Sequence, residues 1–337
     1  MEGALDAKLV MKKIRDSIRA RLRTHFSEKE QQEEIAYAMT QMLKMPVEQA
    51  RALARAGAAQ RTQLNALPPA KNSSRALHTL RNMKVPLDVR EIARELETYD
   101  SCLLALPFTV SAMSLIAQLV SDPRRRFCIV DTRYTRYYFR PFLLAAETRE
   151  RVQLLSPPAM LAQRRKQSEH EGEAIVYVTF PDLETTSLDT ARRVPFMGED
   201  YQFSMLEPLL FFRGVAPLFT FDASVTHRIK LVAYPTASPK VVTEADVDAL
   251  LAWLAGHMEQ VFREVPADVL SWAETLMLAY SMKATTAVMK LKMVEGYVRA
   301  WKAAEPNFKE ATFASAIAEL QHAQETIDKE RLAAISS

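Results

Sequence analysis

The stretch AIVYVTFPDLETTSLDTARRVPFMGEDYQFSMLEPLLFFRGVAPLFTFD, residues 174–222, contains two strand patterns separated by a polar loop, a turn and a helix. The first is an apolar, β-rich run that ends in the pair Pro181-Asp182. The second is the apolar run 215–221, and a helical pattern near residues 204–212 precedes it. Two strands joined by a helical crossover are the unit of a parallel α/β sheet.

Further strand patterns lie outward from this stretch. Apolar runs at residues 101–106, 127–130 and 152–155 precede it, and each is followed by a helical pattern. Two late runs, 218–221 and 228–234, predict partly antiparallel strands. We therefore predict an α/β fold with a mostly parallel central sheet flanked by helices.

Helical patterns also extend this region at both ends. Residues 67–74 have the composition of a loop, which separates a helical lead-in from the sheet. Beyond Trp272 the chain continues with a Met-rich helical stretch, which indicates either a surface for a protein partner or an extra layer on the core. The predicted division is a helical N-terminal region at 1–75, an α/β domain at 76–275 and a helical C-terminal extension at 276–337.

The composition excludes several classes of protein. The 337 residues are 48% hydrophobic, enough for a full core, and the net charge of +3 with no nucleic-acid motif argues against a nucleic-acid partner. Cys102 and Cys128 lie beside apolar runs, which predicts buried thiols of a cytoplasmic protein. The chain has only 7 glycines and contains no glycine-rich nucleotide-binding loop, so we predict no cofactor. No residues have the spacing of metal ligands, so we predict no metal.

Two segments bear on membranes. Residues 103–120 carry no charge, but Pro107 and several hydroxyl residues favour a strand followed by a buried helix from about Ser111. Residues 9–26 form a basic amphipathic helix in sequence, which fits either an anionic membrane surface or packing on the body of the protein. No signal peptide is expected, because lysine and arginine interrupt the first apolar positions.

Several short motifs follow one another in an order found in one enzyme family. A Pro-Asp pair ends the strand at 174–182, a Pro-Phe-x-Gly turn occupies 195–198, and a Gly-x-Ala-Pro segment at 214–217 leads into the next strand. The last of these motifs occupies residues 262–272 and ends in Trp272. This order resembles the lipid A biosynthesis (lauroyl/myristoyl) acyltransferases of the glycerolipid acyltransferase-like superfamily, over residues 20 to 275. The resemblance implies transfer of an acyl group from an acyl carrier protein or CoA thioester to a hydroxyl or amine.

The catalytic positions of the resembled family are altered. There a histidine at the end of the first strand accepts the acceptor's proton, and an acid five residues later orients it. Here Pro107 and Ala112 stand at those positions. His25 and Glu30 have the required spacing but lie across a helix junction, so we assign no catalytic residue. His227 is interpreted as a structural histidine.

The resemblance also implies substrate-binding positions. Arginines 133 and 136 interleave with tyrosines in a helical pattern, which fits an acyl-donor or phosphate-bearing acceptor site or else a solvated helix face. The predicted substrate-binding residues are Arg133, Arg136, Asp182, Arg193, Phe196 and Gly198. Two functions remain open: an acyltransferase with a degenerate catalytic motif, or an inactive homologue that binds an acyl carrier, a lipid or a partner subunit. For either, we expect a cytoplasmic protein with possible peripheral contact at the inner face of the membrane.

Overall fold

The computed structural model describes residues 28–65, 73–167, 174–183, 191–223, 227–272 and 275. They divide between two compact units, one containing residues 28–54 and the other residues 55–275. In the described ranges, no helix has the length and apolar content to cross a membrane. The predicted basic helix at 9–26 and the C-terminal extension at 276–337 lie outside the described residues, and the three-part domain division stays a prediction.

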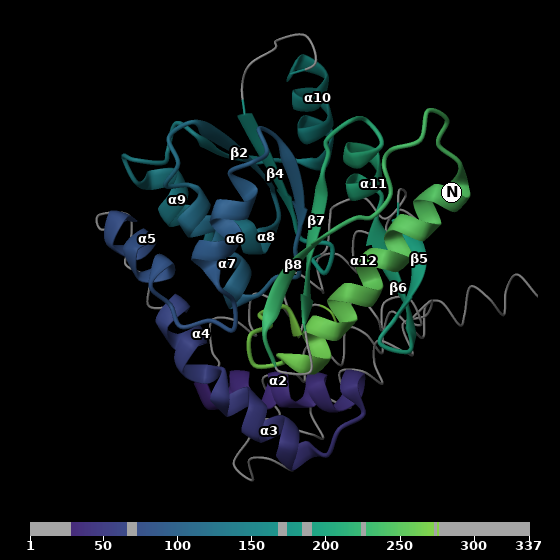
Figure 1. Ribbon diagram of the computed structural model, residues 1–337. Coiled ribbons are helices and arrows are strands. Elements are labelled where there is room, and N and C mark those ends of the chain that lie inside the picture. The colour runs from purple at the N-terminus through teal and green to yellow at the C-terminus, as the bar shows by residue number, and fades with distance from the viewer. Residues whose placement is uncertain are drawn as a thin grey trace, which may run out of the picture. The chain divides into compact units, whose positions relative to one another are not determined.

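The larger unit is built on a six-stranded sheet with the strand order β3-β2-β4-β1-β7-β8 (Figure 1). The first five strands in this order pair in parallel, and β8 pairs antiparallel with β7. This confirms the predicted α/β class with a mostly parallel sheet. The strands of this sheet are β1 (Cys102–Ala105), β2 (Arg125–Val130), β3 (Val152–Leu155), β4 (Ala174–Thr179), β7 (Leu218–Ala223) and β8 (Ile229–Ala233).

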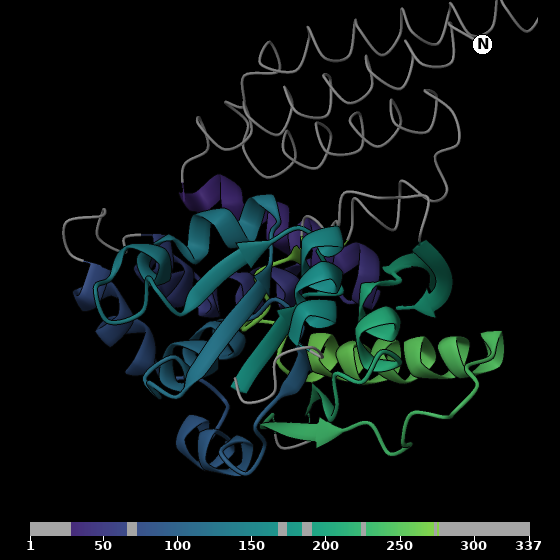
Figure 2. The ribbon, with the colours of Figure 1, turned by 90° about the horizontal axis from the view of Figure 1, so that it is seen from above.

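Helices cover both faces of this sheet. Helices α5, α6, α7 and α9 lie on one face, and α10, α11 and α12 lie on the other (Figures 1 and 2). The helices are α2 (Glu28–Leu43), α3 (Val47–Ala56), α4 (Ala58–Asn65), α5 (Ser73–Arg81), α6 (Val89–Leu96), α7 (Val110–Leu119), α8 (Arg133–Tyr138), α9 (Arg140–Leu144), α10 (Pro157–Gln167), α11 (Leu206–Phe211) and α12 (Glu244–Glu264).

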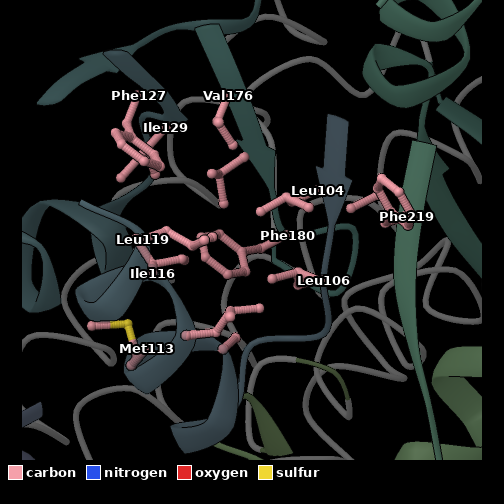
Figure 3. Close-up of a cluster of buried hydrophobic side chains, with 14 of the residues drawn as sticks. Leu104, Leu106, Met113, Ile116, Leu119, Phe127, Ile129, Val176, Phe180 and Phe219 are labelled. Atoms are coloured by element: carbon pink, nitrogen blue, oxygen red, sulfur yellow. The ribbon is translucent and has the colours of Figure 1, made fainter. Parts of the chain in front are cut away.

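The apolar core lies between the sheet and these helices. Figure 3 shows Phe180 among the side chains of Ile116 and Leu119 from α7, Leu104 from β1 and Leu106, which follows β1. All five are buried, as are Cys102 on β1 and Cys128 on β2. The core therefore fixes the segment that follows β4 against the segment that follows β1.

The uncharged run at 103–120 divides as the sequence predicts. β1 ends at Ala105, and α7 begins after Thr109, whose hydroxyl accepts a hydrogen bond from the backbone N–H of Ala112. This is an N-cap, and it stops the apolar run from forming one long helix. Thr243 caps α12 and forms a capping box with Asp246.

The region between β4 and α11 differs from the expected loop and turn. It contains a two-stranded antiparallel sheet, β5 (Ala191–Phe196) and β6 (Glu199–Ser204), joined by Met197 and Gly198. Both residues have positive φ, 57° and 77°, as a tight hairpin turn requires. The arginines and the proline of β5 obscured its strand pattern in the sequence. Helix α5 was also missed, because the predicted loop at 67–74 overlaps its start.

Candidate functional site

The strand order places a topological switch between β1 and its neighbour β4. From β1 the chain leads through α7 to β2 on one side, and from β4 it leads through the hairpin and α11 to β7 on the other. In open α/β sheets, ligands bind where such connections leave the carboxyl ends of neighbouring strands in opposite directions. The segments 106–109 and 180–183 leave these two strands and define the candidate site.

Asp182 is the central charged group of this site. Its side chain is fully buried, and both carboxylate oxygens accept the backbone N–H of Phe108 at 3.0 Å. The hydroxyl of Ser271 donates to the same carboxylate. Asp182, predicted to bind substrate, thus holds three segments of the chain together by contacts with protein groups.

Residues 266–272 lie against the turn that follows β1. Val269 forms an antiparallel bridge with Thr109, the Leu270 N–H donates to the Phe108 carbonyl at 2.9 Å, and the Val110 N–H donates to the Asp268 carbonyl at 2.9 Å. Trp272 in the same segment is fully buried. We call residues 266–272 the closing segment, because they cover the turn at the carboxyl end of β1.

Aromatic side chains connect this turn to α8. Phe108 contacts the rings of Phe180, Tyr138 and Tyr134, with centroids 5.1, 5.5 and 6.0 Å away. Arg136 of α8 points elsewhere and forms a bidentate ion pair with Asp131 at 2.6 Å, with 70% of its own side chain exposed. The side chain of Arg133 lies outside the described part of the structure.

The other predicted binding residues lie on the hairpin. Phe196 is buried against Tyr201 of β6, whose hydroxyl donates to the Asp182 carbonyl at 3.2 Å. Gly198 is exposed at the turn and Arg193 is exposed on β5. The structure therefore brings Phe196 and Asp182 together through Tyr201, whereas Arg193 and Gly198 face solvent. All six assignments stay predictions of substrate contact.

The catalytic positions of the resembled family hold no proton acceptor. Pro107 and Ala112 are both buried, and neither side chain can accept a proton. The alternative pair is not placed: His25 precedes the described residues, and the side chain of Glu30 lies outside them. The turn after β1 therefore supplies no base at the two positions that the resemblance assigns to catalysis.

Two further carboxyl groups are buried around this turn. Burial raises the pKa of Glu207 to about 7 and that of Asp268 to about 6, although hydroxyl groups nearby oppose both shifts. Asp268 accepts the Ser111 backbone N–H at 3.2 Å, and the Thr179 hydroxyl interacts with Glu207. Such shifts occur at functional sites and also in purely structural networks.

A histidine and a carboxylate that the sequence did not connect meet near the end of β7. His257 Nδ1 of α12 lies 3.0 Å from Asp222 Oδ1, and Lys230 Nζ of β8 lies 3.0 Å from Asp222 Oδ2. The two partners of this pair are 35 residues apart, which no local spacing rule detects. His227, in contrast, contacts the backbone carbonyl of Glu264 through Nδ1 and is exposed.

Comparison with known proteins adds no relative. No protein-family model matches the chain, and no curated protein sequence matches it.

Proposed function

We propose that this protein belongs functionally with the lipid A-type acyltransferases and handles an acyl thioester, carried by acyl carrier protein or CoA, together with a hydroxyl or amine acceptor. One observation supports the proposal: the segments that resemble the family in sequence converge on β1, two of them at its carboxyl end and the third near its start. Asp182 of the Pro-Asp pair binds Phe108, Tyr201 of the hairpin binds the Asp182 carbonyl, and the Pro217 carbonyl accepts the Leu103 N–H at 2.9 Å.

A second candidate is an inactive homologue that acts as a binding or partner subunit. It is favoured by the turn itself, since Pro107 and Ala112 offer no base and the closing segment covers the turn. General base catalysis contributes about 10²- to 10⁴-fold to such reactions. Without another proton acceptor, the fold would retain binding and lose turnover.

The test measures binding and turnover on the same full-length protein. Lauroyl and myristoyl thioesters of acyl carrier protein are supplied, binding is followed by calorimetry, and release of the carrier thiol reports transfer. Binding with turnover supports the acyltransferase, and binding without turnover supports the inactive homologue. Failure to bind either thioester or its CoA counterpart would exclude the acyltransferase and an inactive homologue that binds an acyl carrier.

Exposed arginines allow a matched comparison in this assay. Arg136→Gln and Arg193→Gln should weaken thioester binding, since both are predicted to contact the substrate and both are exposed. Arg94→Gln on α6 removes an equally exposed charge and should leave binding unchanged. Equal effects of all three substitutions would show a general effect of charge rather than a site.

The proposed function extends to the membrane surface, where lipid acceptors reside. The basic residues of segment 9–26 would attract anionic headgroups, by roughly 1 kcal/mol for each lysine or arginine near the surface. Sedimentation with vesicles of phosphatidylglycerol should therefore exceed sedimentation with phosphatidylcholine vesicles. Equal sedimentation with the two lipids would remove the peripheral contact from the proposal.

A further inference from the structure

His257 and Asp222 form a histidine–carboxylate pair with a defined orientation. Asp222 accepts from His257 Nδ1 at 3.0 Å, which holds the neutral imidazole as the Nδ1–H tautomer and leaves Nε2 as the acceptor. The Asp222 side chain is 10% exposed and that of His257 is 25% exposed, so the pair is anchored in the protein with one edge open.

Asp222 is held in its charged form. Burial raises its pKa, but hydrogen bonds from His257 and Lys230 outweigh burial, so the net pKa lies below the usual value. An ionised carboxylate behind an imidazole stabilises the imidazolium that forms when Nε2 takes a proton. The pair therefore has the electrostatics of an acid–base group.

The position of the pair relates it to the candidate site. The Thr220 hydroxyl donates to the Ala105 carbonyl at 2.6 Å, which fixes β7 beside the last residue of β1. Asp222 follows Thr220 by two residues and Pro107 follows Ala105 by two residues, and both strands run in the same direction. The pair thus lies toward the same edge of the sheet as the turn that lacks a base.

Aromatic rings line one side of the histidine. Trp253, one turn earlier on α12, has its ring centroid 4.8 Å from that of His257, and Tyr234 lies 5.1 Å from Trp253. All three rings are only partly buried. A partly exposed aromatic surface beside a base suits an acyl chain.

We propose that His257 is a general base for acyl transfer and that Asp222 is the residue that positions it. His257 Nε2 accepts the proton of the acceptor hydroxyl as its oxygen attacks the thioester carbonyl carbon. The new C–O bond forms, the C–S bond breaks, and the leaving thiolate takes the proton from the imidazolium. The thioester substrate rests on the proposed function, whereas the assignment of the base does not.

Two histidines provide a matched pair of variants. His257→Gln should lower the rate of thioester turnover by about 10²-fold or more, the usual contribution of a general base. His227→Gln removes an exposed imidazole whose Nδ1 contacts the Glu264 backbone carbonyl at 2.6 Å and the Glu264 carboxylate at 3.5 Å, and it should change the rate by less than about twofold. Near-UV circular dichroism and thermal midpoints establish that the variants are folded.

A small ester separates failure of this proposal from failure of the proposed function. Hydrolysis of p-nitrophenyl butyrate needs no carrier-protein recognition, so His257-dependent hydrolysis without binding of acyl carrier thioesters would uphold the base and remove the proposed function. Thioester turnover that does not depend on His257 would uphold the proposed function and overturn the base. Absence of His257-dependent turnover with both substrates also overturns the base.

Asp222→Asn tests whether Asp222 positions His257. The measurement is the tautomer of His257, which a general loss of stability would not change selectively. In the full-length wild-type protein, ¹⁵N spectra of the imidazoles should show the Nδ1–H tautomer for His257. Diethyl pyrocarbonate should carbethoxylate its Nε2, as located by peptide mass. In Asp222→Asn, His257 should no longer prefer the Nδ1–H tautomer. The rate of turnover should fall at least 10-fold, by analogy with other His–Asp pairs. A wild-type His257 in the Nε2–H tautomer, or one that the reagent does not modify, overturns the proposal without any variant.

Discussion

Glu207 illustrates how a single residue can limit the stability of this protein. The side chain is 1% exposed, and burial is the main cause that raises its pKa to about 7. The nearby charge of Asp182 raises it further, while the Thr179 hydroxyl and the residue's own backbone N–H lower it. Among the described residues, Oε2 has no hydrogen-bond donor in range. Glu207 therefore favours the protonated form in the folded state.

This shift predicts a pH-dependent effect of Glu207→Gln. The pKa is near 4.5 in the unfolded chain and about 7 in the fold, so the stability linked to protonation is complete below pH 4.5 and is lost as the pH rises through 7. At pH 8 the neutral glutamine should raise the free energy of unfolding by about 2 to 3 kcal/mol. At pH 5 the gain should be small. Urea denaturation at pH 5 and pH 8 measures the change in the free energy of unfolding. An equal effect of the substitution at the two pH values would contradict the shifted pKa.

Asp182 differs from Glu207, because its carboxylate accepts hydrogen bonds from the Phe108 N–H and the Ser271 hydroxyl. Asp182→Ala leaves the buried Phe108 N–H and the Ser271 hydroxyl without this acceptor, and each unpaired buried donor costs about 1 to 3 kcal/mol. We expect the free energy of unfolding to fall by at least about 2 kcal/mol in urea denaturation. Ser271→Ala removes only one of these contacts and should cost about half as much. A nearly neutral Asp182→Ala would show that this carboxylate does not anchor the turn.

At the scale of elements, the hairpin shows the limits of reading this sequence. The division of residues 102–119 into a strand and a helix was predictable, because Pro107 and several hydroxyl residues interrupt the apolar run. The hairpin was not, because its first strand, ARRVPF, contains two arginines and a proline, and only Val194 and Phe196 show the inward alternation. Its position depends on α12, where Glu259 accepts the Met197 N–H at 2.9 Å. That contact spans 62 residues and has no local signature.

Two glycines should respond in opposite ways to alanine. Gly198 has φ +77° with open space around an added Cβ, so Gly198→Ala should cost about 1 kcal/mol through backbone strain alone. Gly256 lies inside α12, also with open space, and Gly256→Ala should stabilise by about 0.5 to 1 kcal/mol. Thermal unfolding of both variants provides the comparison. A stabilising Gly198→Ala would argue against the turn geometry.

At the scale of the whole unit 55–275, contacts between residues that are distant in sequence determine which side chains meet at the carboxyl edge of the sheet. The α/β class followed from the order of strand and helix patterns, and the family-like motifs marked segments that converge on β1. The contacts themselves were not predictable, since Asp182 meets Phe108 across 74 residues and Ser271 across 89. For the same reason the His257–Asp222 pair appears only in three dimensions.

These contacts predict that the closing segment unfolds together with the sheet. The Leu270 and Val110 amides join the segment to the turn after β1, so their hydrogen exchange should be as slow as that of Leu103 in β1. Thr98, whose amide lies in an exposed turn, should exchange much faster. Native-state exchange followed by NMR measures all four. Fast exchange at Leu270 with slow exchange at Leu103 would instead mean that the segment opens locally and admits a ligand.

The two native cysteines allow the opening of the central sheet to be measured by alkylation, without any engineered cysteine. Cys102 and Cys128 lie on strands at either side of β4, both are free, and burial raises the pKa of each thiol to about 12. Alkylation requires the thiolate and physical access, so neither thiol reacts until its own strand separates from its neighbours. Comparing the two labelling rates under native conditions would show whether the sheet parts at β1, at β2 or everywhere at once.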